Sequence, residues 1–426
     1  MSHLRILMLS SFYPPDIGGA QRQIQLLSRE LVRRGHSVAV VTIWQEGLPE
    51  REDDQGVAVY RMKGLTTRVP WFSQEAHRRH HPPFPDPAIV RGLRRLIDQF
   101  QPDVVHSYAW ITYSGAAALF GRNIPLVISA RTYAYTCPIT SMLHHGEVCD
   151  GPAPLKCLEC AAHRYGSVAK SAVAVAGVLG GKAYLKRKVK GVHSVSTFVQ
   201  ETIRSDLFDG EPVLDAVIPS FREKAAAMAP DPEFLSKLPE QPFILFVGAL
   251  TPHKGLPILL EAYRQLAGAP RLILIGTVRG DTPERFPPDV AVFNDVPHQD
   301  VMAAWERCLF GVSPSLWPEP FANVVHECMS KGKAMIGTAA GGYTDIIVDG
   351  ENGLLVPPGD ATALAQALRR LIDDPALRER LGRAAKERAS MYTAELMVPR
   401  FEALYHQAAG LSLGSEGELL GPSPHI

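Results

Sequence analysis

The sequence lacks an excess of charge of one sign, a long hydrophobic run and the glycine fingerprint of NAD-binding domains. Its 44 Lys and Arg residues balance 44 Asp and Glu residues, so no overall field recruits nucleic acid. The longest weakly polar run, residues 171–181, is shorter than the roughly 20 apolar residues that span a bilayer. No GxGxxG follows Leu9 or Val247, which makes an NAD-dependent Rossmann enzyme the weakest of the alternatives.

The N-terminal residues do not predict a leader segment. Residues 1–15 pass directly into an apolar strand pattern, without a charged n-region, a long apolar region or a small-residue cleavage site. We therefore expect a cytoplasmic protein. A membrane contact would need a local patch, and the basic cluster within residues 181–190 offers one: Lys182, Lys186, Arg187, Lys188 and Lys190. This cluster is either a solvated helix face or a peripheral contact with anionic lipid on the inner face of the membrane, worth about 1 kcal/mol per basic residue.

The chain is long enough for two domains of ordinary size, and its hydrophobic content of 46% is that of a globular protein. Short apolar segments alternate with helical patterns, and the same architecture restarts at Phe243. This alternation predicts an α/β protein with two doubly wound parallel sheets. Periodicity is lost around residues 212–230, so we place the domains at 1–215 and 220–390. The expected strands are 4–9, 38–42, 57–62, 104–105, 126–128, 243–247, 271–275 and 290–293; the expected helices include 87–100, 114–120, 256–266 and 299–308.

Residues 318–356 contain the most informative pattern. An apolar strand precedes Pro314 and Pro318, and a helical pattern opens near Phe321. The backbone N–H groups of Ala322, Asn323 and Val324 would then point outward at a helix N-terminus, where a phosphate or pyrophosphate binds favourably. The carboxylates of Glu319 and Glu327 bracket this site and can accept hydrogen bonds from ligand hydroxyls. Two glutamates eight positions apart are by themselves more often solvated surface residues.

The first domain offers weaker signals. Gly18 and Gly19 lie between a predicted strand and a helix, where a ligand can approach the backbone, although such a pair also satisfies plain turn geometry. His106 follows a predicted strand at its carboxyl end. It either lines a cleft or is a structural loop histidine.

Four of the six cysteines, Cys137, Cys149, Cys157 and Cys160, lie within the segment 137–160. Their spacing, C-x11-C-x7-C-x2-C, is compatible with one tetrahedral zinc ion held by thiolates. Disulfides are the alternative but are rare in a reducing compartment, and a CxxC pair can also be redox-active. Cys308 and Cys328 fall in apolar helical patterns and are expected in the core.

Taken together, these segments resemble the retaining glycosyltransferases of family four. The donor-site signature of that family is matched by Glu319 and Glu327 with seven residues between them, then by Gly332-Lys333, Gly341-Gly342 and the segment 349–356. The loop 248–255 resembles the Gly-Arg-Leu-x-x-x-Lys-Gly loop of the family, with Ala249 at the arginine position. PPxxGG near the N-terminus and Ile218-Pro219 in the linker resemble the family's first loop and interdomain linker.

The resemblance implies a GT-B fold, with two Rossmann-like domains facing across a cleft and a sugar transferred from a nucleotide diphosphosugar to an acceptor hydroxyl with retention. Lys254 and residues 322–324 would hold the diphosphate, Glu319 the donor sugar and Glu327 the ribose. Gly248, Gly276 and Phe321 complete the expected donor site, and uridine is slightly favoured as the base. Gly18, Gly19 and His106 would face the acceptor, which is a glycan, a lipid-linked sugar or a small molecule.

The same resemblance implies chemistry without a bound metal, so the zinc site would be structural. It also implies a terminal helix, residues 391–409, that packs back on the first domain before a disordered tail, 410–426. The competing classes are a catalytically inactive sugar-nucleotide or glycan binding protein and a GT-B epimerase or phosphorylase.

Arg131 stands where the family has a cleft-facing histidine. Because Ala249 removes a guanidinium from the donor loop, we hypothesise that Arg131 supplies this charge from the facing wall, to the diphosphate or to an acidic group of the sugar or acceptor. The alternative is an arginine paired with a neighbouring carboxylate, Glu147 or Asp150.

Overall fold

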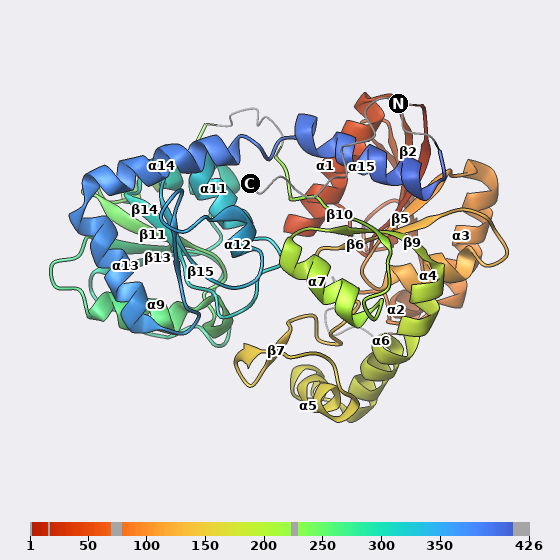
Figure 1. The fold of residues 1–426 in the computed structure, drawn as a ribbon, viewed down its shortest axis with the longest axis horizontal. Coiled ribbons are helices and arrows are strands. Elements are labelled where there is room, and N and C mark those ends of the chain that lie inside the picture. The colour runs from red at the N-terminus through yellow and green to blue at the C-terminus, as the bar shows by residue number, and fades with distance from the viewer. Residues whose placement is uncertain (1, 16–17, 70–78, 223–228, 412–426) are drawn as a thin grey trace. The chain divides into compact units, whose positions relative to one another are not determined.

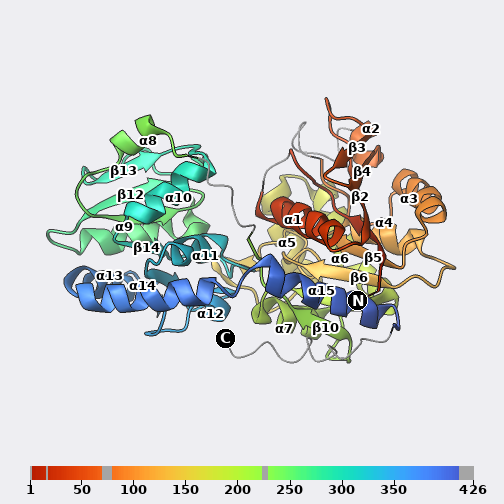
Figure 2. The same cartoon turned by 90° about the horizontal axis from the view of Figure 1, so that it is seen from above.

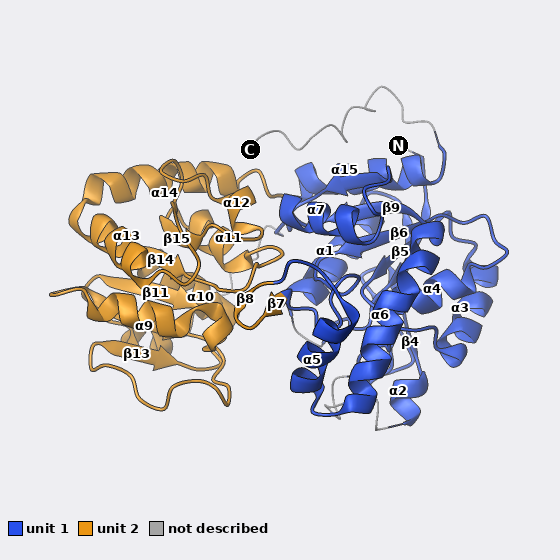
Figure 3. Ribbon diagram, turned by 60° about the horizontal axis from the view of Figure 1, so that its bottom comes forward, with its two compact units in different colours: residues 1–142, 149–223, 394–425 blue, residues 143–148, 224–393, 426 orange. Residues whose placement is uncertain are grey.

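The computed structural model describes residues 2–15, 18–69, 79–222 and 229–411. The chain divides into two compact units, each built around its own parallel sheet (Figures 1 and 3). Unit 1 contains residues 1–142, 149–223 and 394–425, and unit 2 contains residues 143–148, 224–393 and 426. Residues 412–426, most of the segment expected to be a tail, lie outside the described part of the chain.

The sheet of unit 1 has eight strands in the order β10-β9-β6-β5-β1-β2-β4-β3. All pairings are parallel except that of β3 with β4. The strands are β1 (Arg5–Leu9), β2 (Ser37–Ile43), β3 (Arg51–Asp54), β4 (Val57–Met62), β5 (Val104–Tyr108), β6 (Leu126–Ala130), β9 (Val189–Ser194) and β10 (Leu214–Val217). Strand β3 was not predicted, because its sequence, REDD, contains only charged residues.

Alternation along the strands sends side chains to two helical layers. Ile6 and Met8 of β1 face a cluster that includes α1 (Gly19–Arg33) and α15 (Ala394–Ala408), which lie side by side (Figure 2). Leu9 points the other way, so that a Cβ added to Gly115 of α4 would lie 2.5 Å from it. The remaining helices are α2 (Leu65–Arg68), α3 (Pro87–Phe100), α4 (Ile111–Ala118), α5 (Pro154–Tyr165), α6 (Val168–Lys188) and α7 (Thr197–Asp206).

One boundary of unit 1 differs from the sequence prediction. Unit 1 does not end between residues 215 and 220, because β10 and the buried Phe221 still belong to the first core. A strand of four residues is too short to show periodicity, which explains why this segment was taken for a linker. Helix α15 belongs to unit 1, where Phe401 and Tyr405 are buried in its core.

Helix α6 extends beyond the weakly polar run of residues 171–181 at both ends. Its 21 residues are long and apolar enough to cross a membrane by length and composition, and 28% of the apolar window is buried against the protein. Core helices of water-soluble proteins meet the same criterion, so this finding alone does not assign a membrane span.

Unit 2 has a six-stranded parallel sheet in the order β13-β12-β11-β14-β15-β16. Its strands are β11 (Phe243–Val247), β12 (Arg271–Ile275), β13 (Val290–Phe293), β14 (Phe310–Ser313), β15 (Met335–Thr338) and β16 (Leu354–Val356), and a separate hairpin pairs β7 (Leu143–His144) with β8 (Glu147–Val148). The helices are α8 (Pro232–Lys237), α9 (Leu256–Arg264), α10 (His298–Arg307), α11 (Asn323–Ser330), α12 (Tyr343–Ile346), α13 (Ala361–Asp373) and α14 (Pro375–Ala389), with a 3-10 turn, η2 (Pro252–Lys254).

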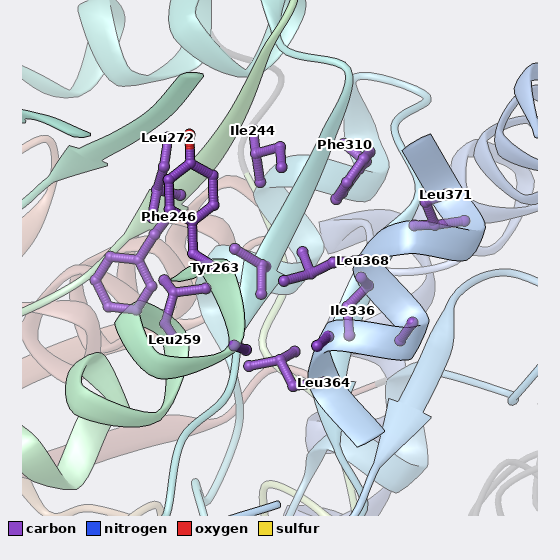
Figure 4. Packing of buried hydrophobic residues seen from close by; sticks show 14 of the residues in the cluster. Ile244, Phe246, Leu259, Tyr263, Leu272, Phe310, Ile336, Leu364, Leu368 and Leu371 are labelled. Carbon is purple, nitrogen blue, oxygen red and sulfur yellow. The ribbon is translucent and has the colours of Figure 1, made fainter. Parts of the chain in front are cut away.

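One face of this sheet is covered by α9 and α13. Leu259 of α9 and Leu364 and Leu368 of α13 pack on Ile244 and Phe246 of β11, and all five side chains are buried (Figure 4). Burying a leucine side chain contributes about 1.5–3 kcal/mol relative to leaving it exposed. This packing fixes the sheet whose carboxyl edge holds the candidate donor site.

Candidate functional site

The strand order of each sheet reverses at one point, and ligands of doubly wound folds bind at the carboxyl ends of the strands there. In unit 2 this point lies between β11 and β14, which are adjacent and parallel. The loops that leave these two strands contain Lys254 and Glu319. The topology therefore brings together two residues that the sequence analysis had selected separately.

Lys254 Nζ donates a short hydrogen bond to Glu319 Oε1, and the two side chains form an ion pair. Only 8% of Glu319 is exposed. A carboxylate with so little solvent needs a cationic partner or several hydrogen-bond donors. The ammonium group also lies 4.7 Å from the centroid of the Trp317 ring, in a cation–π arrangement. Lys254 is thus held in place by two groups of the β14 loop.

The Gly341-Gly342 turn fixes the backbone of Glu319. Gly342 N–H donates to Glu319 O at 2.6 Å. Gly341 has a φ of +60°, and a Cβ at this position would lie 2.6 Å from Glu319 O. A side chain there would push the glutamate loop away, so this turn needs glycine for both its backbone conformation and the close approach.

A second close approach joins the loops that follow β11 and β12. A Cβ added to Gly276 would lie 1.6 Å from Gly248 O, and Gly248 N–H donates to Ile275 O at 3.0 Å. Ala249 lies in the same loop and is partly exposed, and its carbonyl accepts from Thr251 N–H at 2.9 Å. The absence of a Cβ at Gly276 lets the two loops touch beside Lys254.

Helix α11 begins at Asn323, two residues later than predicted. Phe321 and Ala322 are buried, and Asn323 N–H donates to Phe321 O at 3.1 Å. This bond corrects the expectation that all three amides of residues 322–324 point outward, because one of them is used to close the turn before the helix. Val324 is partly exposed at the helix start.

Glu327 lies one turn into α11, with 13% of its side chain exposed, and His298 Nε2 is 3.1 Å from its Oε1. Sequence reasoning missed His298. The residue opens α10 after β13, so its position at the carboxyl edge of the sheet was the signal that could have identified it.

Unit 1 contains a cavity of about 510 Å³ at its own point of strand reversal, between β1 and β5. Gly18 and Gly19, at the N-terminus of α1, line this cavity, as do Tyr108 and Trp110 after β5. Apart from Arg131, the aromatic and basic residues that line the cavity were not identified from the sequence, because they come from separate segments. They include Phe12, His80, His81, Arg164, Tyr165 and Lys170.

His106 does not line the cavity and corrects the expectation of a cleft-facing residue. Its side chain is fully buried, and Nδ1 lies 2.7 Å from the Tyr405 hydroxyl of α15. Burial, with a smaller effect of the Arg131 charge, lowers the pKa of His106 to about 3. The imidazole is therefore neutral and structural, because the terminal helix covers the face of the sheet on which it lies.

Arg131 follows β6 and lines the cavity. One of its terminal nitrogens donates to Ser220 Oγ at 2.6 Å. No carboxylate in the described part of unit 1 forms an ion pair with it, and Asp150 pairs instead with Lys156. Glu147 lies in the β7–β8 hairpin of unit 2. The expected approach of Arg131 to Ala249 would join two units that the structure describes separately.

The four clustered cysteines all carry free thiols in unit 1, two of them on α5. Burial raises the pKa of the Cys160 thiol, and the neighbouring Cys137, Cys149 and Cys157 raise it further, so the four groups influence one another electrostatically. Within the described residues the four sulfur atoms do not all lie within 4.8 Å of one another. A zinc site would therefore require the segment 137–160 to move so that the sulfur atoms come closer together. Cys308 and Cys328 are fully buried in unit 2.

The basic cluster of residues 182–190 is partly neutralised. Lys182 pairs with Asp206, and Lys186 pairs with Asp209 at 2.8 Å and with Glu211 at 2.7 Å. Arg187 and Lys190 remain exposed. Lys188 Nζ lies 5.2 Å from the centroid of the Phe120 ring, which is 69% exposed.

Two family models match the sequence, one for each unit. The glycosyl transferase 4-like domain matches residues 18–219, and glycosyl transferases group 1 matches residues 230–388. Glycogen synthase of Mycobacterium tuberculosis is 26% identical over 418 residues, covering 90% of each chain. D-inositol 3-phosphate glycosyltransferase of Pseudarthrobacter chlorophenolicus is 28% identical over 399 residues, covering 88% of this chain and 86% of the relative.

Solved structures share the fold over nearly the whole chain. Sucrose-phosphate synthase from Thermosynechococcus elongatus aligns with a TM-score of 0.72 at 21% identity and covers 96% of this chain and 100% of its own. Anabaena HepE, solved in complex with UDP, aligns with a TM-score of 0.62 at 18% identity and covers 94% and 98%. These similarities show a GT-B fold.

Proposed function

The chain belongs to the glycosyl transferases of group 1, and on this premise we propose how its residues move a sugar from a nucleotide diphosphosugar to an acceptor hydroxyl with retention of configuration. The observation that supports the proposal most directly is the Lys254–Glu319 pair at the carboxyl edge of the unit 2 sheet. The pair places an ammonium group that can bind a diphosphate next to a carboxylate that can accept hydrogen bonds from sugar hydroxyls. Both groups are held by packed glycine turns.

Charge grows on the departing diphosphate as the glycosidic bond breaks, and groups already oriented toward it lower the barrier. Lys254 has three N–H donors, so it can keep its bond to Glu319 while a second donor reaches a phosphate oxygen. Glu319 then binds hydroxyls of the donor sugar, and Glu327 binds the ribose hydroxyls. Gly248 and Gly276 let the nucleotide approach the backbone, next to residues 321–324.

We propose a uridine nucleotide as the donor. Support comes from neighbours in the fold: Anabaena HepE was solved with UDP and with UDP-glucose. A plant starch synthase of the same fold was solved with ADP, so the base needs a direct test. The acceptor is assigned to unit 1, whose cavity contains Gly18 and Gly19.

The test is incubation with a panel of radiolabelled sugar nucleotides and a membrane glycolipid extract. Transfer of label to an acceptor is expected, and Glu319→Gln should lower its kcat/KM by about 10²-fold or more while leaving the protein folded. Ala249 favours one competing function, an inactive sugar-nucleotide binding protein, because the donor loop lacks its second cation. Binding without transfer or hydrolysis by any donor would establish that function instead.

We also propose that Cys137, Cys149, Cys157 and Cys160 bind one structural zinc ion and that the chemistry needs no metal. Supporting this are the free thiols and their mutual effect on the Cys160 pKa. Zinc would hold the segment between β6 and α5 by its thiolates and take no part in sugar transfer.

A peripheral membrane contact in the cytoplasm is the remaining proposal. Arg187, Lys190 and the exposed Phe120 suit an anionic lipid surface, but the pairing of Lys182 and Lys186 with carboxylates reduces the attraction. Co-sedimentation with vesicles containing anionic lipid, compared with neutral vesicles, tests it.

A further inference from the structure

We propose that the cavity of unit 1 binds an acceptor that bears an anionic group, a phosphate or a carboxylate, and that Arg131 is the residue that receives this group. The inference rests on the proposed function, because it assumes that unit 1 binds the acceptor. It adds the chemical class of that acceptor and the residue that selects it.

The first observation is that Arg131 is a cation without a counterion among the residues that the structure describes. Its hydrogen-bond partner is the neutral Ser220 hydroxyl, and its Nε is buried with no hydrogen-bond partner among the same residues. Burial lowers the pKa of Arg131 to about 10, so the guanidinium is still charged at neutral pH. A buried charge without a partner is costly, and a bound anion would supply the missing acceptors.

The groups around Arg131 do not compensate its charge either. Burial, followed by the positive charge of Arg131, lowers the pKa values of His106 and His193, so both imidazoles are neutral. Tyr108 is the third neighbour, and burial raises the pKa of its phenol well above the ordinary value. The surroundings of the guanidinium are therefore neutral at physiological pH.

The second observation is the charge of the cavity wall. Arg131, Arg164 and Lys170 line the cavity together with two histidines, and no Asp or Glu is among the described lining residues. The whole chain has equal numbers of acidic and basic residues, so this wall departs from the average of the molecule. Positive charges gathered in a cleft raise the local concentration of an anionic ligand.

The rest of the wall suits a ring-shaped acceptor. Trp110 and Tyr165 present aromatic side chains to the cavity, and the indole N–H of Trp110 is fixed by a hydrogen bond to Ala134 O at 2.8 Å. The Tyr165 hydroxyl donates to Pro138 O at 2.7 Å, and this hydrogen bond joins the end of α5 to the start of the cysteine-bearing segment 137–160. Ile139, Thr140 and Arg164 extend this side of the cavity, so that segment shapes acceptor selectivity.

Titration calorimetry on the full chain tests the proposal with four probes: inorganic phosphate, a hexose 6-phosphate, a hexuronate and the corresponding neutral hexose. We expect the hexose phosphate or the hexuronate to bind at least 10-fold more tightly than the neutral hexose, and their order identifies the anion. Arg131→Gln should lower the affinity for the anionic probe about 10- to 100-fold, as expected for lost hydrogen bonds to a charged group. The affinity for the neutral hexose should not change.

Arg95→Gln is the matched control, because it removes one exposed arginine of unit 1 that lies outside both the cavity wall and the basic cluster of residues 182–190. It should bind the anionic probe as the unmodified protein does. Arg131→Lys keeps the charge but loses the planar fork, so an intermediate loss is expected, and this variant decides the matter if Arg131→Gln does not fold. Quenching of Trp110 fluorescence, absent in Trp110→Phe, locates the probe in the cavity.

Equal affinity of Arg131→Gln and the unmodified protein for the anionic probe overturns the proposal, as does preference for the neutral hexose. Loss of UDP affinity in Arg131→Gln with unchanged binding of the anionic probe would assign Arg131 to the donor instead. Failure of the proposed function is recognised separately, by absent binding and hydrolysis of every sugar nucleotide, because the calorimetric assay of the cavity needs no donor.

Discussion

Lys254 and Glu319 lie 65 positions apart in the sequence and form an ion pair, because the parallel strands β11 and β14 that precede their loops are neighbours. The pair is mostly shielded from solvent, with 21% of the lysine and 10% of the glutamate side chain exposed. This places it between surface ion pairs, which contribute little, and fully buried ones, in which removal of one partner is destabilising.

Removing either partner should have unequal effects on stability. Lys254→Met leaves Glu319 buried without a cation and should lower the free energy of unfolding by about 1–3 kcal/mol, whereas Glu319→Gln leaves a more exposed ammonium and should cost less. Both changes should lower kcat/KM by about 10²-fold or more. Urea denaturation and kinetics of the single variants and the double variant measure these effects. Additive stability losses would show that the two groups are not coupled.

Glu327→Ala should weaken nucleotide binding. Loss of hydrogen bonds to a charged acceptor costs about 1.5–3 kcal/mol, which corresponds to about 10- to 150-fold in the dissociation constant. Calorimetry with UDP measures this change. His298→Gln provides the comparison, because it removes only the partner of the Glu327 carboxylate. Unchanged UDP affinity in Glu327→Ala would exclude Glu327 from the site.

The two roles considered for Arg131 predict different results for one double variant. Arg131→Ala should lower kcat/KM for transfer by about 10²-fold. If Arg131 replaces the charge missing at Ala249, adding Ala249→Arg should restore part of this loss. If Arg131 binds the anionic group of the acceptor, the added arginine should leave the loss in place, and the effect should appear mainly in KM for the acceptor.

The four clustered cysteines should hold about one equivalent of zinc in purified protein, as measured by elemental analysis. Chelation should lower the melting temperature before it affects the chemistry of the protein that remains folded. Cys157→Ser should reduce the zinc content, whereas Cys308→Ser, in the core of unit 2, should not. Metal-free protein with four titratable thiols after anaerobic purification would contradict the site.

The terminal helix should confer an acid-sensitive part of the stability. Burial alone would raise the pKa of Glu402, but hydrogen bonds from His36 and Arg34 outweigh it and hold this pKa at about 2. A carboxyl whose pKa is lower in the folded state stabilises the protein above its unfolded pKa, and this contribution is lost as the pH falls from about 5 to about 2.

The shift corresponds to roughly 3 kcal/mol at neutral pH as an upper limit. We therefore expect Glu402→Gln to be less stable at pH 7 and to lose less stability between pH 5 and pH 3 than the unmodified protein. Urea denaturation as a function of pH measures this difference. Glu30→Gln, which removes a local i,i+3 pair with Arg33, is the control and should leave the acid profile nearly unchanged.

The sequence by itself predicted many of the strands and helices and indicated the candidate donor residues. Strands β4, β11, β12 and β13 have the predicted bounds, because continuous or alternating apolar residues between turn residues mark buried and half-buried strands. Glu319, Glu327, Lys254 and the Gly341-Gly342 turn were identified because a local motif lies within one stretch of chain. The short edge strand β10 and the charged strand β3 were missed, since neither has a periodic apolar pattern.

Only the tertiary structure decided which residues face each other. His106 lies within β5 and Arg131 follows β6, and in the sequence both stood near the carboxyl end of a predicted strand. In the structure α15 covers His106, whereas Arg131 lines the cavity. The lining of that cavity comes from segments as distant as Phe12 and Lys170, so its excess of cations has no counterpart in any local pattern. Charge and burial at such a site depend on contacts between distant segments, and these contacts exist only once the chain has folded.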